Sequence, residues 1–296
     1  MTAPVIGVVG LGSMGSRFAR RFSSAGYEVH VYNRTRDRAA ALEDLGVQVR
    51  KSPRELAERS DVVISMVWDS EALTQVMTGS DGVLGGLGPG KIVADASTVE
   101  PEVSARLAEL VAERGATMLD IPVSGSLDKA AAGELTLMVG GSAAVLERVR
   151  PVLEVLGNSV LHVGERNGSG LVIKLAVNMQ VAAQAVAWGE GLALAAEYGI
   201  GRKTATQVML HSVIASPMLT YRAPFVLAPP DEVWATAAQL RKDVAYAVER
   251  SAGSARAAAH ALELLDDICR SGRGDREAAE LIVQAASPQV REAPAP

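Results

Sequence analysis

The sequence predicts an α/β protein in two parts: a doubly wound, mainly parallel sheet at the N-terminus, followed by an all-α C-terminal domain. Three observations lead to this fold class. Short β-branched runs alternate with helical stretches over the first half of the chain. A glycine-rich turn follows the first of those runs. After His162-Val163-Gly164 the strand pattern stops, and only helical patterns follow.

The expected strands are short and rich in β-branched residues, as the strands of a buried sheet are. They lie at Val5–Val9, Glu28–Tyr32, Val62–Val67, Lys91–Asp95, Thr117–Ile121 and Thr136–Val139. Helices are expected between them at Ser16–Ser24, Arg36–Leu45, Pro53–Glu58, Val103–Arg114 and Ala143–Leu156. Strands that alternate with helices form βαβ units, which place helices on both faces of a parallel sheet.

The second half of the chain is expected to be helical. Its first helix, Gly168–Tyr198, is rich in alanine and long for a globular protein, so we expect it to span a domain junction or a subunit interface. Further helices are expected at Thr204–Ser212, Asp231–Ser251, Ala255–Arg270 and Glu277–Ala286. The predicted organisation is an α/β domain over residues 1–164, a helical domain over residues 165–287 and a disordered, proline-containing tail over residues 288–296.

Composition excludes several classes of function. A chain of 296 residues with 48% hydrophobic residues can form two packed cores, and its net charge of −5 disfavours a nucleic-acid binder. No apolar stretch is long enough to cross a bilayer without charges, and the N-terminus lacks a signal-peptide pattern. The single Cys269 excludes an internal disulfide and a cysteine-rich metal site, and the four histidines show no metal spacing. We therefore expect a soluble, cytoplasmic protein without a metal site.

The glycine-rich turn, Gly10-Leu11-Gly12-Ser13-Met14-Gly15, stands between the first expected strand and the first expected helix. In this position the first glycine allows a tight turn, the second lets the backbone approach a pyrophosphate, and the third lets helix and strand pack closely. The N–H groups of the helix then face the phosphates. The alternative is an ordinary glycine-rich turn. The context favours a dinucleotide site in a Rossmann-type domain.

The end of the second strand indicates which dinucleotide binds. An NAD enzyme usually carries Asp or Glu there for the ribose 2′-hydroxyl, whereas this chain has Asn33-Arg34-Thr35-Arg36. Arg34 can pair with a 2′-phosphate and stack on adenine, and Thr35 can donate a hydrogen bond. The alternative is a pair of solvated arginines at a helix start. The pattern favours NADPH over NADH.

Lys174 stands in an otherwise apolar segment of the long helix, and Asn178 follows four residues later on the same face. Reduction of a ketone or aldehyde creates an alkoxide that needs a proton, and oxidation of an alcohol requires removal of that proton. A lysine that apolar neighbours desolvate has a lowered pKa and can do either. The asparagine amide can position the lysine or the substrate oxygen. The alternative is a lysine that extends to solvent from the edge of a helix.

Ser124-Gly125-Ser126 follows Pro122 and an expected strand. Two hydroxyls and exposed N–H groups beside a glycine suit a substrate carboxylate. Taken alone, this segment would be a plain turn, and its value lies in its occurrence with the other two motifs.

The residues described so far resemble the β-hydroxyacid dehydrogenase family over nearly the whole chain. Its motifs stand in family order: Gly10–Gly15; Asn33-Arg34-Thr35; Asp95-Ala96-Ser97-Thr98-Val99; Pro122-Val123-Ser124-Gly125; Leu135-Thr136-Leu137-Met138-Val139-Gly140-Gly141; Gly168-Ser169-Gly170 with Lys174 and Asn178; and Lys242-Asp243. The resemblance implies that Lys174 is the catalytic acid or base, Asn178 its partner, and Ser124 and Gly125 the substrate anchor. It implies that Met66, Val67, Thr98 and Lys242 line the cofactor site, and Thr98 is also assigned to the substrate.

Within the family, three segments look most like the glyoxylate/succinic semialdehyde reductases: Ser124-Gly125-Ser126, Lys174-Leu175-Ala176-Val177-Asn178-Met179 and Ser216-Pro217-Met218. Two departures bear on the substrate. Those enzymes commonly carry Lys-Gly-Pro where this chain has Arg222-Ala223-Pro224, and Leu127-Asp128-Lys129 matches neither main subgroup. Both segments are expected near the substrate pocket.

The sequence thus predicts an NADPH-dependent oxidoreductase of a small carbonyl compound, one that carries a carboxylate, with a homodimer formed through the helical domain. Two alternatives stay open. One is an imine reductase-like enzyme, although such enzymes usually lack a lysine at the catalytic position. The other is a non-catalytic dinucleotide-binding interaction protein.

Overall fold

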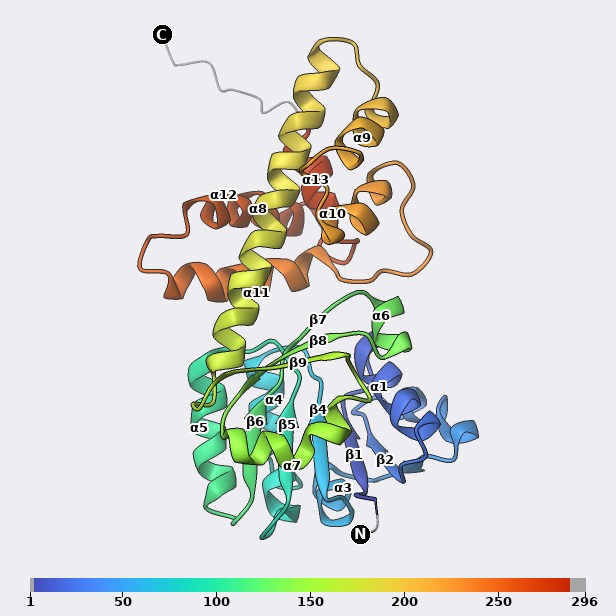
Figure 1. Cartoon of the computed structure of the whole chain (residues 1–296), viewed down its shortest axis with the longest axis vertical. Helices are drawn as coiled ribbons and strands as arrows, with labels where there is room; N and C mark the ends of the chain where they lie inside the picture. Colours follow the sequence, from blue (N-terminus) through green and yellow to red (C-terminus); the bar gives the residue numbers. More distant parts are fainter. Residues whose placement is uncertain (1–2, 288–296) are drawn as a thin grey trace. The chain divides into compact units, whose positions relative to one another are not determined.

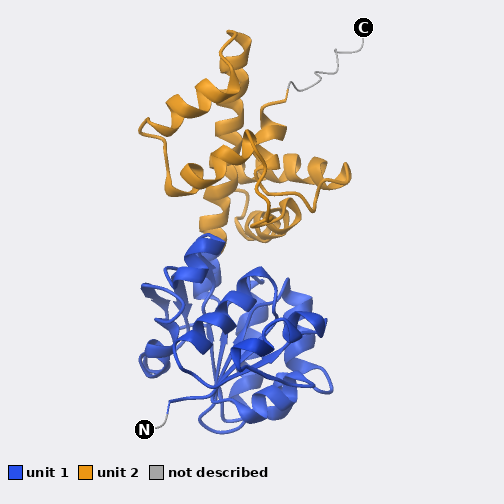
Figure 2. Cartoon of the chain, turned by 90° about the vertical axis from the view of Figure 1, so that its right-hand side faces the viewer, with its two compact units in different colours: residues 1–174 blue, residues 175–296 orange. Residues whose placement is uncertain are grey.

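The first compact unit of the chain, residues 1–174, is built around one sheet with helices on both of its faces (Figures 1 and 2). The computed structural model describes residues 3–287. Within them the sheet contains β1 Ile6–Val9, β2 Val29–Tyr32, β3 Gln48–Val49, β4 Val62–Ser65, β5 Ile92–Asp95, β6 Thr117–Asp120, β7 Val123–Ser124, β8 Thr136–Gly140 and β9 Ser159–Gly164. The helices are α1 Ser13–Ser24, α2 Asp37–Ala40, α3 Pro53–Arg59, α4 Ser70–Thr78, α5 Pro101–Ala112, α6 Leu127–Ala132 and α7 Ala143–Leu153.

The strand order is β3-β2-β1-β4-β5-β6-β8-β7, with β9 paired to β8. From β3 to β6 every pairing is parallel, and β8 is antiparallel to β6 and β7. The chain therefore runs outward in one direction from β1 to β3 and in the other from β4 to β6. The predicted doubly wound sheet is confirmed.

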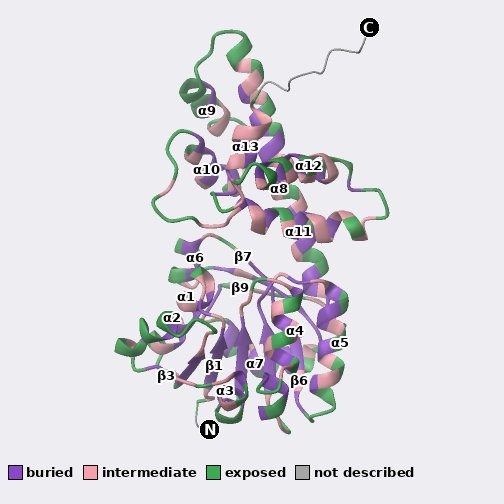
Figure 3. Ribbon diagram, turned by 180° about the vertical axis from the view of Figure 1, so that it is seen from behind, coloured by how far each residue is buried: buried purple, intermediate pink, exposed green. Residues whose placement is uncertain are grey.

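The central strands β1, β4 and β5 are buried on both faces of the sheet, which explains the continuous apolar runs of the sequence there (Figure 3). Along β4, Val62 and Ile64 face one core while Val63 faces the other. Successive side chains of a strand point to opposite faces, so a strand covered by helices on both sides must be apolar at every position.

The second unit, residues 175–296, is helical wherever the structure describes regular structure in it. Its elements are the larger part of α8 Ser169–Glu197, then α9 Arg202–Leu210, α10 Pro217–Arg222, a 3-10 turn at Ala223–Val226, α11 Ala237–Arg250, α12 Arg256–Arg270 and α13 Glu280–Ala285. Trp188 and many alanines form its core. The predicted all-α second part is confirmed. The division between the units falls inside α8, after Lys174, whereas the predicted domain boundary at Gly164 stays a prediction.

Helix α8 is long and apolar enough to span a membrane by length and composition alone. Its buried residues Ala182, Ala185 and Trp188 pack into the core of the second unit, which accounts for part of its apolar composition. The tail predicted to be disordered, residues 288–296, lies outside the described residues.

Some expected elements differ from the structure. The helix expected over Asp231–Ser251 begins only at Ala237, because Thr236 and Gln239 form a capping box there. The helix expected over Arg36–Leu45 is divided into α2 and a 3-10 turn at Glu43–Leu45. Helices α4, α6 and α10, and strands β3, β7 and β9, were not expected. Most of them are six residues or shorter, too short to show a period.

Candidate functional site

The predicted cofactor residues of the first unit lie in loops that follow the carboxyl ends of its parallel strands. Gly10–Gly15 follow β1, Asn33–Thr35 follow β2, Met66 and Val67 follow β4, and Thr98 lies beyond β5. Because the chain runs outward from β1 on one side and from β4 on the other, the β1 and β4 loops diverge there. In open α/β sheets, ligands bind in the crevice at this switch point.

The three motif glycines meet different surroundings. A Cβ on Gly10, where φ is +90°, would overlap the carbonyl oxygen of Met66, and a Cβ on Gly15 would overlap that of Gly10. A Cβ on Gly12 would meet only Arg38 Nη1, at 4.0 Å. The fold itself therefore requires the first and third glycines, while the space above Gly12 suits a ligand that approaches the backbone closely.

Helix α1 begins at Ser13, three residues earlier than expected, so its first turn is part of the glycine motif. No side chain caps this helix, because its N-cap residue is Gly12. The N–H groups of a first turn have no acceptor inside the helix and face outward. N–H groups in this position can bind an anion, so contact of this turn with a dinucleotide pyrophosphate stays a prediction.

Asn33 connects the glycine motif to the β2 loop. Its Oδ1 accepts the Leu11 N–H at 2.8 Å, and its Nδ2 donates to the Thr35 carbonyl at 2.9 Å. These two hydrogen bonds hold the β2 loop, with the exposed residues Arg34 and Thr35, next to the glycine motif. Contact of these three residues with a cofactor stays a prediction.

Asp95 and Ser97, to which sequence reasoning gave no role, hold the β4 and β5 loops together. The Oδ1 atom of the fully buried Asp95 accepts from the hydroxyls of Ser65 and Ser97, each at 2.7 Å, and from the Ser97 N–H at 3.2 Å. The Ser97 hydroxyl in turn accepts the Val67 N–H at 2.9 Å. Burial raises the pKa of Asp95 to about 6, against the lowering effect of the two hydroxyls. A carboxylate at the end of an apolar strand is the sequence signal for this network.

The Ser124-Gly125-Ser126 segment is only partly a plain turn. Ser124 ends β7 and pairs with Thr136, while Ser126 accepts the Lys129 N–H and caps α6. The Ser126 hydroxyl is therefore used inside the fold, so Ser124 is the better placed of the two for a substrate. Leu127–Lys129, the unusual segment of the sequence, is the first turn of α6. Binding of a substrate here stays a prediction.

Lys174 lies six residues into α8, as the last residue of the first unit. The neighbouring Val172 and Ile173 are 55% and 42% exposed, so the apolar run around Lys174 does not by itself bury it. Residues adjacent in a helical sequence point in different directions. What fixes this part of the helix is Asp120, at the end of β6, which accepts the N–H groups of Gly168 and Leu171 at 2.7 and 3.0 Å.

Asn178 is buried in the second unit, where its Nδ2 donates to Asp243 Oδ2 at 2.7 Å. The other oxygen of Asp243 accepts from Lys242 at 2.6 Å, and the Lys242 ammonium lies 5.0 Å from the ring centre of Tyr246. A carboxylate can only accept here, so it fixes the amide of Asn178 with its nitrogen toward Asp243. Asp243 stands in the Lys242-Asp243 motif, but the sequence pattern alone assigned it no function. The predicted catalytic role of Asn178 and cofactor role of Lys242 stay predictions.

Arg222, expected near the substrate pocket, is buried inside the second unit. Its guanidinium lies 3.2 Å from Glu277 Oε1, and the other oxygen of Glu277 accepts the N–H groups of Trp234 and Ala235. This arrangement assigns Arg222 to the packing of the helical unit, because a buried charge requires such a partner.

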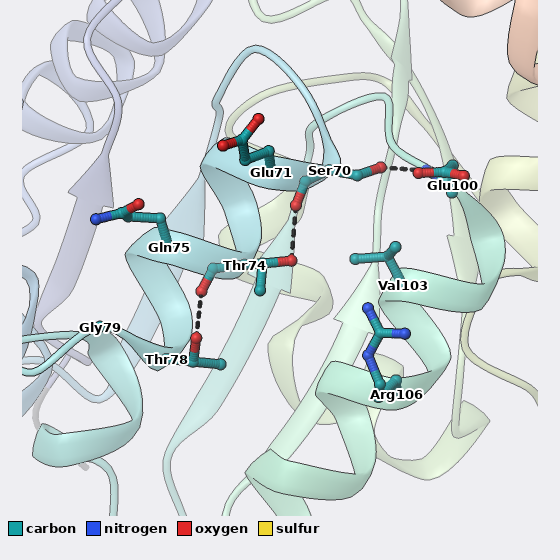
Figure 4. A pocket seen from close by; sticks show the side chains of 9 residues that line it. All are labelled: Ser70, Glu71, Thr74, Gln75, Thr78, Gly79, Glu100, Val103 and Arg106. Carbon is teal, nitrogen blue, oxygen red and sulfur yellow. Dashed lines mark hydrogen bonds between the residues drawn. The ribbon is translucent and has the colours of Figure 1, made fainter.

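A groove of about 530 Å³ lies between α4 and α5 (Figure 4). It is lined by Ser70, Glu71, Thr74, Gln75, Thr78, Gly79, Glu100, Val103 and Arg106. Its hydroxyls are already bonded: Thr74 and Thr78 donate to the preceding turns of α4, and Ser70 accepts the Glu100 N–H. None of the predicted site residues lines it. Among the described residues, no group of three or more His, Cys, Asp or Glu side chains can hold a metal ion.

Comparisons with known proteins agree with this geometry. Residues 5–164 match the NAD binding domain of 6-phosphogluconate dehydrogenase, and residues 168–284 match the NAD-binding family of NADP-dependent 3-hydroxyisobutyrate dehydrogenase. The chain is 31% identical over 294 residues to the chloroplastic glyoxylate/succinic semialdehyde reductase 2 of Arabidopsis thaliana, covering 97% of this chain and 81% of that protein. It is 35% identical over 207 residues to the NAD-dependent L-serine dehydrogenase of Pseudomonas aeruginosa, covering 70% of this chain and 69% of that protein.

Among solved structures, 3-hydroxyisobutyrate dehydrogenase from Salmonella typhimurium superposes with a TM-score of 0.85 at 29% identity, covering 94% of this chain and 98% of that one. The family matches cover both units, and the glycine motif has the geometry of a dinucleotide site. The chain therefore belongs to the β-hydroxyacid dehydrogenase family, and it is an NAD(P)-dependent oxidoreductase that acts on CH–OH groups or the corresponding carbonyls.

Proposed function

We propose that this protein uses NADPH to reduce a small carbonyl compound that carries a carboxylate, with Lys174 as the general acid. The observation that carries the proposal lies within the first unit. Asp120, at the carboxyl end of β6, binds the first turn of the helix that bears Lys174. The glycine motif lies at the same edge of the sheet. An amine and a dinucleotide site at one edge suit a reaction that moves a hydride and a proton together.

When bound, the dinucleotide supplies the hydride that such a reduction adds to the carbonyl carbon. The chain's own residues handle the oxygen and the carboxylate. Lys174 Nζ gives a proton to the carbonyl oxygen as negative charge develops there. Ser124, Gly125 and Thr98 bind the carboxylate through hydroxyl and N–H groups. Asn178, with its amide fixed by Asp243, positions the substrate oxygen or the amine.

The preference for NADPH rests on Arg34. Its exposed guanidinium follows β2, and no carboxylate lies among residues 33–36 to repel a 2′-phosphate. The description of the family that matches residues 168–284 supports NADP, whereas the relative from P. aeruginosa is named as NAD-dependent. Steady-state KM values for NADPH and NADH decide between them.

The substrate is tested with a panel. We expect NADPH oxidation with at least one of glyoxylate, succinic semialdehyde, methylmalonate semialdehyde and tartronate semialdehyde. Turnover of a cyclic imine but of no semialdehyde would instead identify an imine reductase. Tight NADPH binding without turnover of any compound would favour a non-catalytic role.

A homodimer formed through the second unit is part of the proposal. The end of α8 and helix α9 expose a cluster of apolar side chains, among them Leu194, Tyr198 and Val208, which are 59%, 80% and 65% exposed. With Gly191, Ala195, Ile200, Ala205 and Met209 they line a hollow of about 510 Å³. Contiguous exposed apolar surface of this kind usually marks an interface.

A further inference from the structure

The first turn of α8 is capped by a side chain from a distant strand. Asp120, fully buried at the end of β6, accepts the Gly168 N–H through Oδ1 and the Leu171 N–H through Oδ2, at 2.7 and 3.0 Å. Gly168 is the N-cap residue, since its carbonyl accepts the Val172 N–H. A glycine has no side chain with which to cap the helix. Asp120 therefore satisfies two N–H groups that the helix itself leaves without acceptors.

Two glycines bring the helix and the carboxylate this close. A Cβ on Gly140 of β8 would lie 2.5 Å from Asp120 Oδ1. A Cβ on Gly170 of α8 would lie 2.8 Å from Asp120 Oδ2 and would overlap the Met138 carbonyl oxygen. Such close packing sets the first turn of α8 directly against the sheet, where the carboxylate of Asp120 can reach its N–H groups.

This arrangement is electrostatically expensive. Desolvation raises the pKa of Asp120, and the N–H groups of Gly168 and Leu171 act in the opposite direction. Gly168 has φ +97°, and a Cβ there would lie 2.8 Å from the Pro101 carbonyl oxygen, so the helix cannot carry a capping side chain of its own at this position. What a carboxylate on β6 adds is a rigid link between the helix and the edge of the sheet.

We propose that Asp120 is a positioning residue. It fixes the first turn of α8 along the helix axis and in rotation about it, so that Lys174 meets the substrate oxygen. This inference rests on the proposed role of Lys174. Lys174 follows Leu171 by three residues, just under one turn, so the Asp120 contact directly controls its position. A shift of about 1 Å between reacting groups lowers rates by roughly 100-fold.

The test is the variant Asp120→Asn, which keeps the shape of the side chain. Its amide oxygen still accepts one N–H, but its amide nitrogen faces the other. In single turnovers of NADPH with succinic semialdehyde, we expect the rate to fall by about 10- to 100-fold. The Kd of NADPH should change by less than about threefold, because Asp120 bonds to no residue of the glycine motif.

A double-mutant cycle separates positioning from a general loss of structure. If Asp120 acts through the amine, Asp120→Asn lowers the residual rate of a Lys174→Ala enzyme little further. The matched control is Asp95→Asn, a buried carboxylate in register with Asp120 on the neighbouring strand that bonds to no residue of α8. Any loss of rate caused by Asp95→Asn should be independent of the amine, so the double variant Asp95→Asn/Lys174→Ala should lose rate by the product of the two single losses.

Hydrogen–deuterium exchange gives a readout that does not depend on turnover. Amides 168–171 should exchange faster in Asp120→Asn and at the wild-type rate in Asp95→Asn. Unchanged exchange, or a full multiplicative loss of rate in the cycle, overturns the positioning role while leaving that of Lys174 intact. If Lys174→Ala is as fast as wild type, or no compound of the panel is reduced, the proposed function fails and the positioning role fails with it.

Discussion

Replacement of Gly12 by Ala tests the dinucleotide site without disturbing the fold. Gly12 has φ −72° and ψ −170°, a conformation open to any L-residue. Its new Cβ would meet only Arg38 Nη1, at 4.0 Å. Alanine is a poorer N-cap than glycine by roughly 0.5–1 kcal/mol. It also restricts the unfolded chain, which stabilises the folded state by about 0.4–1 kcal/mol. These effects oppose each other, so the free energy of unfolding should change by less than about 1 kcal/mol.

Cofactor affinity should respond very differently. The methyl group enters the space where the pyrophosphate meets the N–H groups of α1. One hydrogen bond to a charged group contributes about 1.5–3 kcal/mol, so the Kd of NADPH should rise by roughly 10- to 150-fold. Gly10→Ala and Gly15→Ala place a Cβ on a backbone oxygen, and they should lower the free energy of unfolding by several kcal/mol.

The assay combines titration of NADPH fluorescence with urea denaturation of each variant. Gly201→Ala is the matched control, because Gly201 is the N-cap residue of α9, has φ −64° and ψ 146°, and has open space around its Cβ position. It should change stability as Gly12→Ala does and leave the Kd of NADPH unaltered. A Gly12→Ala protein that binds NADPH within twofold of the wild-type affinity would refute the assignment of this loop to the pyrophosphate.

Four further predictions concern the amine, the cofactor, a buried carboxylate and the assembly. Lys174→Ala should lower kcat by at least about 100-fold with an unchanged Kd for NADPH; a kcat above a tenth of the wild-type value would mean that another group supplies the proton. Arg34→Asp should move the preference from NADPH toward NADH by about 10- to 100-fold, and KM values that change together would contradict the proposed clamp. Since the pKa of Asp95 is raised from 3.8 to about 6, the folded chain retains a proton there that the unfolded chain has lost, so stability falls as pH rises through this window. In Asp95→Asn, the fall in the free energy of unfolding across this window should be smaller by about 3 kcal/mol. Urea titrations from pH 4 to 7 in which the free energies of wild type and variant change equally with pH would disprove it. Light scattering should give a dimer mass that Val208→Asp converts to a monomer mass; a monomeric wild-type protein at micromolar concentration would rule out the dimer.

The sequence by itself determined the features that depend on local pattern. The alternation of β-branched runs with helical stretches predicted the parallel sheet, because a strand covered on both faces must be apolar throughout. The position of Gly10–Gly15 after the first strand predicted the turn into α1. Glycine is required there because the backbone packs so closely at Gly10 and Gly15 that a Cβ would overlap a carbonyl oxygen. Motif order carried the family assignment. The long alanine-rich segment predicted α8 almost to its ends.

Only the tertiary structure decided how the site is held. The contacts that hold the helix of Lys174 and Asn178 join residues far apart in sequence: Asp120 with Gly168 and Leu171, and Asn178 with Asp243. Periodicity identifies which face a residue occupies, but it carries no information on which distant donor meets a buried oxygen. The burial of Lys174 was inferred from neighbours in sequence, two of which face solvent. The environment of a helical side chain is set by the elements packed against it, and those become known only when the chain has folded.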